Sequence, residues 1–283
     1  MDMEYLFYFL AFIFGSLIGS FLNVVIYRYN TGLTLLGRSF CFSCNKQLTW
    51  TELFPVFSFL ALRGKCRFCK SKISWQYTIV ETLMGLLSAL IFWRLGGMSA
   101  FLNRVTSARV DLEWFLFVAF LFIVFGLLLA VSVYDFKHKI IPDNWVYTFA
   151  AVAFLRLVFL PGTFMFTPGL WDLLAGPALA LPFALLWVVS EGRWMGLGDA
   201  KLSLGLGWFL GIKAGITAIV LAFWLGAIFG VALLAVDRLA KSSIFHRRTT
   251  MKSELPFAPF LILGLLLVFF IPEVMNYVTV WMY

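Results

Sequence analysis

Residues 113–134 read EWFLFVAFLFIVFGLLLAVSVY, and this stretch, charged only at its first residue, decides the fold. A membrane-spanning helix needs about 20 apolar residues to cross about 30 Å of hydrocarbon. Six comparable runs occupy residues 5–27, 77–95, 144–160, 172–190, 214–236 and 256–281. An eighth run, 200–212, spans only about 20 Å, so we expect it to lie among neighbouring helices or to be incompletely buried. The sequence predicts an all-α polytopic membrane protein with about eight transmembrane helices.

The composition excludes most soluble classes of protein. Of the 283 residues, 62% are hydrophobic and 13% are charged, whereas an average soluble domain carries roughly 25% charged residues. Such a chain is a poor candidate for a disordered protein, a secreted disulfide scaffold or a cytosolic globule.

The basic residues are concentrated on alternate loops. Loops 28–76, 135–143, 191–201 and 237–255 hold 17 of the 22 Lys and Arg residues. Positively charged loops remain in the cytoplasm, so both termini are expected outside. We therefore predict a first transmembrane helix at 1–27, a cytoplasmic domain at 28–76 and a transmembrane bundle at 77–283.

Four cysteines stand in two pairs, Cys41-x2-Cys44 and Cys66-x2-Cys69, separated by 21 residues. Each pair directs two thiolates at one centre, and four thiolates complete a closed tetrahedral shell around Zn²⁺. Two disulfides or a free redox pair are the alternatives. Disulfides require an oxidising compartment, whereas the charge pattern puts this loop in the cytoplasm. The spacing therefore favours a structural zinc ion.

Two acidic residues lie where apolar runs meet the predicted cytoplasmic face. Asp135 follows the run 113–134, and Asp199 precedes the run 200–212. Two carboxyl groups that meet can share one proton, so that one activates water while the other polarises a peptide carbonyl. Asp199 at a helix N-terminus is also suited to capping, and acids in membrane segments equally serve transport. A protease dyad, helix caps and a proton-coupled transporter all remain open on spacing alone.

The motifs around these residues resemble those of the bacterial prepilin peptidases, which belong to the GxGD-type membrane aspartic proteases. Gly196–Leu202 is similar to the GxGD-x-KL motif of that family. Further similar motifs are the N-terminal signature Gly19–Arg28, the cysteine-loop pattern Leu62–Cys69, the first acid motif Asp135–Asp143 and the last motif Leu255–Phe260. The chain departs from the common pattern at Phe42, Thr78 and Ala258.

The resemblance implies a bifunctional, multi-pass enzyme of the bacterial inner membrane. It implies cleavage of type IV prepilins or type II pseudopilins after a glycine at the cytoplasmic face, followed by N-methylation with S-adenosylmethionine. Asp135 and Asp199 would form the protease dyad, the four cysteines would bind zinc, and Gly64 is at a position linked to methyl transfer. Prepilin substrates and membrane lipids are the expected partners, and nucleic acid is not. A proton-coupled transporter using the same two aspartates is the alternative, and a catalytically idle scaffold that docks a secretion ATPase is another.

The sequence allows more than one role for each of three other polar residues. Asp143 competes with Asp135 for the first catalytic position, although capping the following helix suffices to explain it. Asn23 is expected to form a helix–helix hydrogen bond or to lie near the substrate or methyl donor. Glu81 is expected to pair with a lysine or arginine of the loop, or to bind the substrate's new amine or the methyl donor.

Overall fold

The structure, a computed structural model, describes residues 3–35, 37–106, 112–159, 169–239 and 255–280. These residues form helices connected by loops, with no β-strand among them, so the predicted all-α class is confirmed. The chain divides into two compact units, Met1–Ala130 and Val131–Tyr283. Helix α5 (Leu112–His138) crosses this division.

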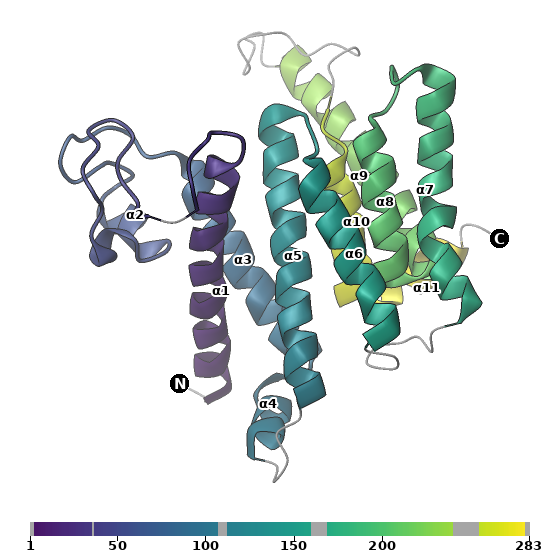
Figure 1. The fold of residues 1–283 in the computed structure, drawn as a ribbon, viewed down its shortest axis with the longest axis horizontal. Helices are drawn as coiled ribbons and strands as arrows, with labels where there is room; N and C mark the ends of the chain where they lie inside the picture. The colour runs from purple at the N-terminus through teal and green to yellow at the C-terminus, as the bar shows by residue number, and fades with distance from the viewer. Residues whose placement is uncertain (1–2, 36, 107–111, 160–168, 240–254, 281–283) are drawn as a thin grey trace. The chain divides into compact units, whose positions relative to one another are not determined.

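The first unit is built on two long helices, α1 (Met3–Arg28) and α3 (Trp75–Arg94), which pack along each other (Figure 1). The loop between them contains the short helices η1 (Trp50–Glu52) and α2 (Phe57–Ala61). Helix α4 (Gly97–Thr106) follows α3 and was not expected from the apolar runs. Helix α3 begins at Trp75 because the side chain of Ser74 accepts the backbone N–H of Gln76 as an N-cap.

Small residues allow α1 and α3 to approach closely. A Cβ atom added to Gly19 would lie 2.8 Å from the Cα atom of Glu81, and one added to Gly15 would collide with Ser88. On the facing side, Gly85 of α3 leaves room for Phe12 and for the hydroxyl of Ser16. Glycines spaced four residues apart are typical of closely packed membrane helices. This contact sets the positions of the polar residues farther along both helices.

In the second unit, four other helices surround the short helix α8 (Leu197–Leu210) (Figure 1). Its neighbours in contact are α6 (Asp143–Phe159), α7 (Leu170–Ser190), α9 (Ile212–Leu239) and α10 (Ala258–Phe270). Helix α8 packs tightly because a Cβ atom at Gly205 would lie 2.5 Å from the ring of Phe149. The expectation that run 200–212 lies among neighbours is confirmed.

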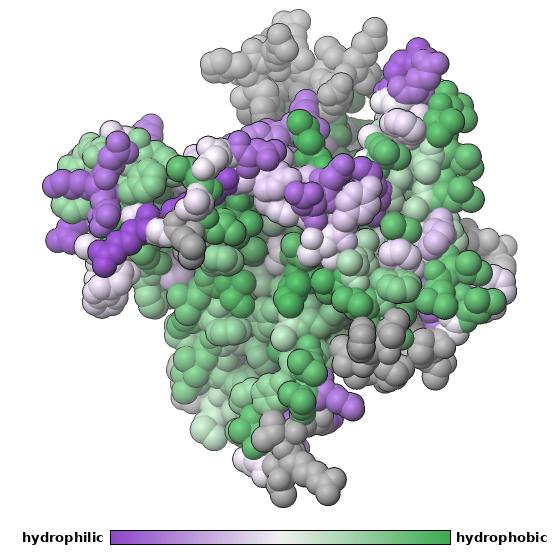
Figure 2. All heavy atoms as spheres, in the orientation of Figure 1, coloured by the Kyte–Doolittle hydropathy of each residue, from purple (hydrophilic) through white to green (hydrophobic). Residues whose placement is uncertain are grey.

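The surface of the helices is that of a multi-pass membrane protein. Five helices of the described residues are long and apolar enough to cross a membrane: α1, α3, α5, α7 and α9. Large apolar side chains such as Phe9, Phe14 and Phe21 of α1 are exposed, and Figure 2 shows hydrophobic residues covering the visible lengths of the helices. The total of eight crossings stays a prediction, because α6, α8 and α10 are shorter than 18 residues.

The last apolar run, 256–281, is not one helix as predicted. It is divided into α10 (Ala258–Phe270) and α11 (Glu273–Val280). The division falls at Pro272, which has no backbone N–H and clashes with the preceding turn of a helix.

We predict that Gly15→Val destabilises the first unit, because the added side chain would collide with Ser88 across the α1–α3 contact. Overpacking of this kind costs about 1–3 kcal/mol. The measurement is thermal unfolding in detergent, where the midpoint should fall. Leu17→Val, on the exposed side of α1, is the control and should leave the midpoint close to that of the unchanged chain. Equal midpoints for Gly15→Val and the unchanged chain would contradict the packing argument.

Candidate functional site

The four cysteines of the first unit come together in the loop between α1 and α3. Their Sγ atoms all lie within 4.8 Å of one another, and those of Cys41 and Cys69 are 3.8 Å apart. Four sulfurs at about 2.3 Å from a tetrahedral metal ion lie about 3.8 Å from one another. All four cysteines are free thiols, so the arrangement fits a metal site, and the disulfide alternative does not describe this structure.

Each cysteine pair is held by the same backbone pattern. Cys41 N–H donates to the carbonyl of Lys46, and Cys66 N–H donates to that of Ser71, both at 2.9 Å. The residue after each pair, Asn45 or Lys70, has a positive φ of 55° or 59°, which reverses the chain beneath the thiols. The two halves of the cysteine cluster are thus two turns of the same kind.

Local hydrogen bonds favour the metal-binding form of two thiols. The backbone N–H of Ser43 contributes most to lowering the pKa of Cys41 to about 6. The hydroxyl of Ser71 lies 3.1 Å from Cys69 Sγ and lowers the pKa of that thiol. The thiolate is the form of cysteine that binds metals.

The two aspartates singled out from the sequence both lie in the second unit. Asp135 lies in the last turn of α5 and Asp199 in the first turn of α8, with 5% and 7% of their surfaces exposed. Their carboxyl groups are within electrostatic reach of each other. Asp135 Oδ2 and Asp199 Oδ1 are buried and accept no hydrogen bond from any described residue. Two such carboxyl groups resist ionising together and are suited to sharing a proton.

Three segments hold this carboxylate pair. The backbone N–H of Ala258, at the start of α10, donates to the Asp135 carboxylate. The motif Leu255–Phe260 therefore contacts the acid of the motif Asp135–Asp143. A Cβ atom on Gly198 would lie 2.8 Å from Cβ of Ile141. Ile141 occupies the space beside this glycine, so Gly198 allows the two acid motifs to pack closely.

Asp143, unlike Asp135, forms an ion pair with a lysine side chain. It begins α6 as expected, and its carboxylate accepts a hydrogen bond of 2.8 Å from Lys201 Nζ. Lys201 lies on α8, two residues after Asp199. This ion pair connects the two acid motifs, and sequence reasoning missed it although both residues belong to the motifs.

A cavity of about 310 Å³ in the first unit brings together residues that the sequence had left separate. Asn23 forms the expected helix–helix hydrogen bond, from its Nδ2 to the carbonyl of Tyr77 at 3.0 Å. Glu81 pairs with no lysine or arginine of the described residues. Its Oε2 instead accepts the backbone N–H of Val56 at 2.8 Å, because the loop folds back onto α3.

Gly64 lies in the turn between α2 and the second cysteine pair. Its φ of +66° favours glycine, and a Cβ atom there would lie 3.0 Å from the ring of Phe59. Phe59 and Cys66 line the cavity, whereas Gly64 does not. Its link to methyl transfer stays a prediction.

Comparisons with known proteins match both units. Residues 13–95 match the family model for the bacterial peptidase A24 N-terminal domain, and residues 122–231 match that for the type IV leader peptidase family. A prepilin leader peptidase/N-methyltransferase of Bacillus subtilis (strain 168) is 32% identical over 264 residues, 92% of each chain. Proteins of the same name from Stutzerimonas stutzeri and Pseudomonas putida are 29% and 30% identical, over 89% of this chain and 86% of each relative. No solved structure matches.

We predict that the purified chain carries one metal ion bound by the four cysteines, and that Cys41→Ser lowers its metal content severalfold. The measurement is elemental analysis of protein purified in detergent. Ser43→Ala keeps both neighbouring thiols and the backbone N–H, so it should retain the metal. Metal content unchanged by Cys41→Ser would disprove the assignment of this site.

Proposed function

This chain belongs to the type IV leader peptidase family, and on that basis we propose that it cleaves type IV prepilins or type II pseudopilins after a glycine and then methylates the new N-terminal amine. S-adenosylmethionine is the proposed methyl donor. We propose that cleavage takes place at the cytoplasmic face of the bacterial inner membrane, where the basic leader of the substrate and the basic loops of the enzyme both face anionic lipid.

The observation that carries the peptidase proposal is the burial of Asp135 and Asp199 with an unpartnered oxygen atom on each. A buried carboxyl oxygen without a hydrogen bond is costly. A water molecule between the two carboxyl groups would satisfy both oxygens, and that water is the nucleophile that an aspartic peptidase requires.

The proposed mechanism uses the two carboxyl groups in opposite protonation states. The ionised carboxylate takes a proton from water as the oxygen attacks the scissile carbonyl carbon, and the protonated carboxyl donates to the carbonyl oxygen. In the second step the newly protonated group gives its proton to the leaving nitrogen, the C–N bond breaks, and the other carboxylate takes back a proton from the gem-diol as the new carboxyl group forms. The N–H of Ala258 and the Asp143–Lys201 ion pair hold the participating segments in position.

We propose structural Zn²⁺ at Cys41, Cys44, Cys66 and Cys69. Four thiolates close the coordination shell and leave no open position for a substrate. When bound, the ion would supply stability to a loop that has few buried apolar residues of its own. The cytoplasmic domain 28–76 and the transmembrane bundle 77–283 of the sequence prediction are kept as part of this proposal.

A proton-coupled transporter built on the same two aspartates is less well supported. Transporter sites lie near the middle of the membrane, often at broken helices. Asp135 and Asp199 lie instead in the last turn of one helix and the first turn of another.

We predict that Asp135→Asn and Asp199→Asn each lower leader cleavage by at least about 100-fold, because each removes one of the two proton-transfer groups. Asp143→Asn should retain part of the activity, since Asp143 only pairs with Lys201. The measurement is mass spectrometry of a prepilin peptide incubated with purified enzyme. Substantial cleavage by either of the first two variants would refute the dyad.

We predict that Gly198→Ala lowers cleavage by about tenfold or more while the chain remains folded. The added methyl group would push Ile141 away, and misplacing a catalytic group by about 1 Å can cost on the order of 100-fold. Gly196→Ala is the control, because a Cβ atom there meets nothing closer than 3.9 Å. Cleavage rates should be compared at matched thermal stability; similar losses in both variants would contradict the packing role of Gly198.

A further inference from the structure

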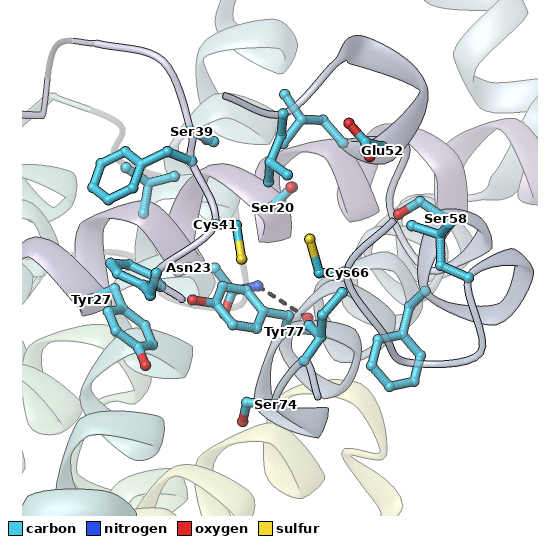
Figure 3. Close-up of a pocket in the computed structure, with 18 of the residues that line it drawn as sticks. Ser20, Asn23, Tyr27, Ser39, Cys41, Glu52, Ser58, Cys66, Ser74 and Tyr77 are labelled. Carbon is cyan, nitrogen blue, oxygen red and sulfur yellow. Dashed lines mark hydrogen bonds between the residues drawn. The ribbon is translucent and has the colours of Figure 1, made fainter. Parts of the chain in front are cut away.

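The cavity of the first unit has a mixed lining that suits a polar small molecule. Its volume of about 310 Å³ is at the lower end of small-molecule sites, which are about 300–1,000 Å³. Residues of α1, the cysteine loop and α3 line it, and Figure 3 shows Asn23, Cys41, Cys66 and Tyr77 around it. The walls are mostly apolar and aromatic, and Tyr27 stacks between Phe42 and Tyr77 with centroid distances of 4.9 and 5.6 Å.

Buried polar atoms of this lining lack partners among the described residues. Asn23 is 1% exposed, and its Oδ1 accepts no hydrogen bond even though its Nδ2 is used. The hydroxyl of Thr78 is also buried without a partner. Both residues line the cavity. Buried polar groups of this kind are normally satisfied, so the lining is suited to a ligand with hydrogen-bond donors.

Glu81 places a carboxyl group in the same cavity. The residue is 8% exposed, and its carboxylate accepts hydrogen bonds from the N–H of Val56 and the hydroxyl of Ser20. Val56 has φ of +60°, a conformation that β-branched residues rarely adopt. Strained backbone that is kept in place clusters at functional sites. Here it directs an N–H at the Glu81 carboxylate and so fixes the orientation of that group.

We propose that this cavity is the methyl-transfer site, that it binds S-adenosylmethionine together with the substrate's new N-terminal amine, and that Glu81 accepts the proton which the amine releases. This inference rests on the proposed N-methyltransferase activity and adds the site and the residue. The charges agree with the ligands, because a carboxylate attracts both an ammonium group and a sulfonium ion, and aromatic faces attract cations as well.

The proposed step balances in atoms and charge. The neutral amine nitrogen forms a bond to the methyl carbon as the bond from that carbon to sulfur breaks, and the electron pair stays on sulfur. The product is first a methylammonium group, and Glu81 takes one proton from its nitrogen to leave a neutral methylamine. The Asn23 amide oxygen can accept the remaining N–H and hold the lone pair toward the methyl carbon.

The test uses the full-length enzyme in detergent, with Glu81→Gln and the cavity-filling variant Val24→Trp. Val24 lines the cavity from α1. The readouts are binding of radiolabelled S-adenosylmethionine, methylation of an already cleaved peptide, and leader cleavage. Glu81→Gln should lower methylation by about 100-fold, the scale of a lost general base, and should also weaken donor binding, because it removes the carboxylate that attracts the sulfonium ion. Val24→Trp should abolish donor binding, and both variants should still cleave the leader.

Glu113→Gln is the matched control, because Glu113 is an exposed acid of the same unit outside the cavity. It should bind, methylate and cleave like the unchanged chain. If Glu81→Gln or Val24→Trp methylates at the unchanged rate, the methyl-transfer site lies elsewhere and this inference is overturned while the proposed function stands. If the unchanged enzyme cleaves but neither binds the donor nor methylates, the proposed methyltransferase activity fails together with this inference.

Discussion

The burial of two carboxyl groups at helix ends is the constraint on which the second unit depends. Removing an ionised carboxylate from water costs several kcal/mol unless it gains partners. Asp135 and Asp199 are nevertheless almost fully buried, and the helices around them are arranged to allow it. Helix α8 is short and rich in glycine, so it fits among its neighbours, with Phe149 against Gly205 and Ile141 against Gly198. The tight packing keeps the two acids within electrostatic reach of each other while leaving an oxygen of each unsatisfied. That combination is expected of a site that binds a reactive water.

In the first unit, glycines again allow helices to pack closely beside buried polar residues. Gly15 and Gly19 let α1 approach α3 closely, and one turn beyond this contact Asn23 reaches the backbone of Tyr77. The loop that carries the cysteines then covers the ends of both helices and brings Val56 to Glu81. Cys41 and Cys66 are themselves part of the cavity lining. The cysteine cluster, the cavity and the helix contact are therefore parts of one structure, and a change to one is expected to affect the others.

The sequence predicts those features that depend on composition or on spacing along the chain. Long apolar runs predict the helices, and two CxxC pairs predict the thiol cluster that the structure contains. Tertiary partners are not visible in this way. Nothing in the spacing indicates that Lys201 pairs with Asp143 or that Val56 bonds to Glu81, because both contacts arise only after distant segments have packed. Hydropathy alone also joined α10 and α11 into one run, although Pro272 was there to predict the break.

The central claim is that Asp135 and Asp199 act as one site. It is tested most directly by an experimental structure of the enzyme in lipid with a bound transition-state mimic that carries a hydroxyl group. The account predicts that this hydroxyl lies within hydrogen-bonding distance, about 2.5–3.0 Å, of an oxygen atom from each of the two carboxyl groups. A structure in which the mimic contacts only one of them, or in which the carboxyl groups are too far apart to share one atom, would contradict it.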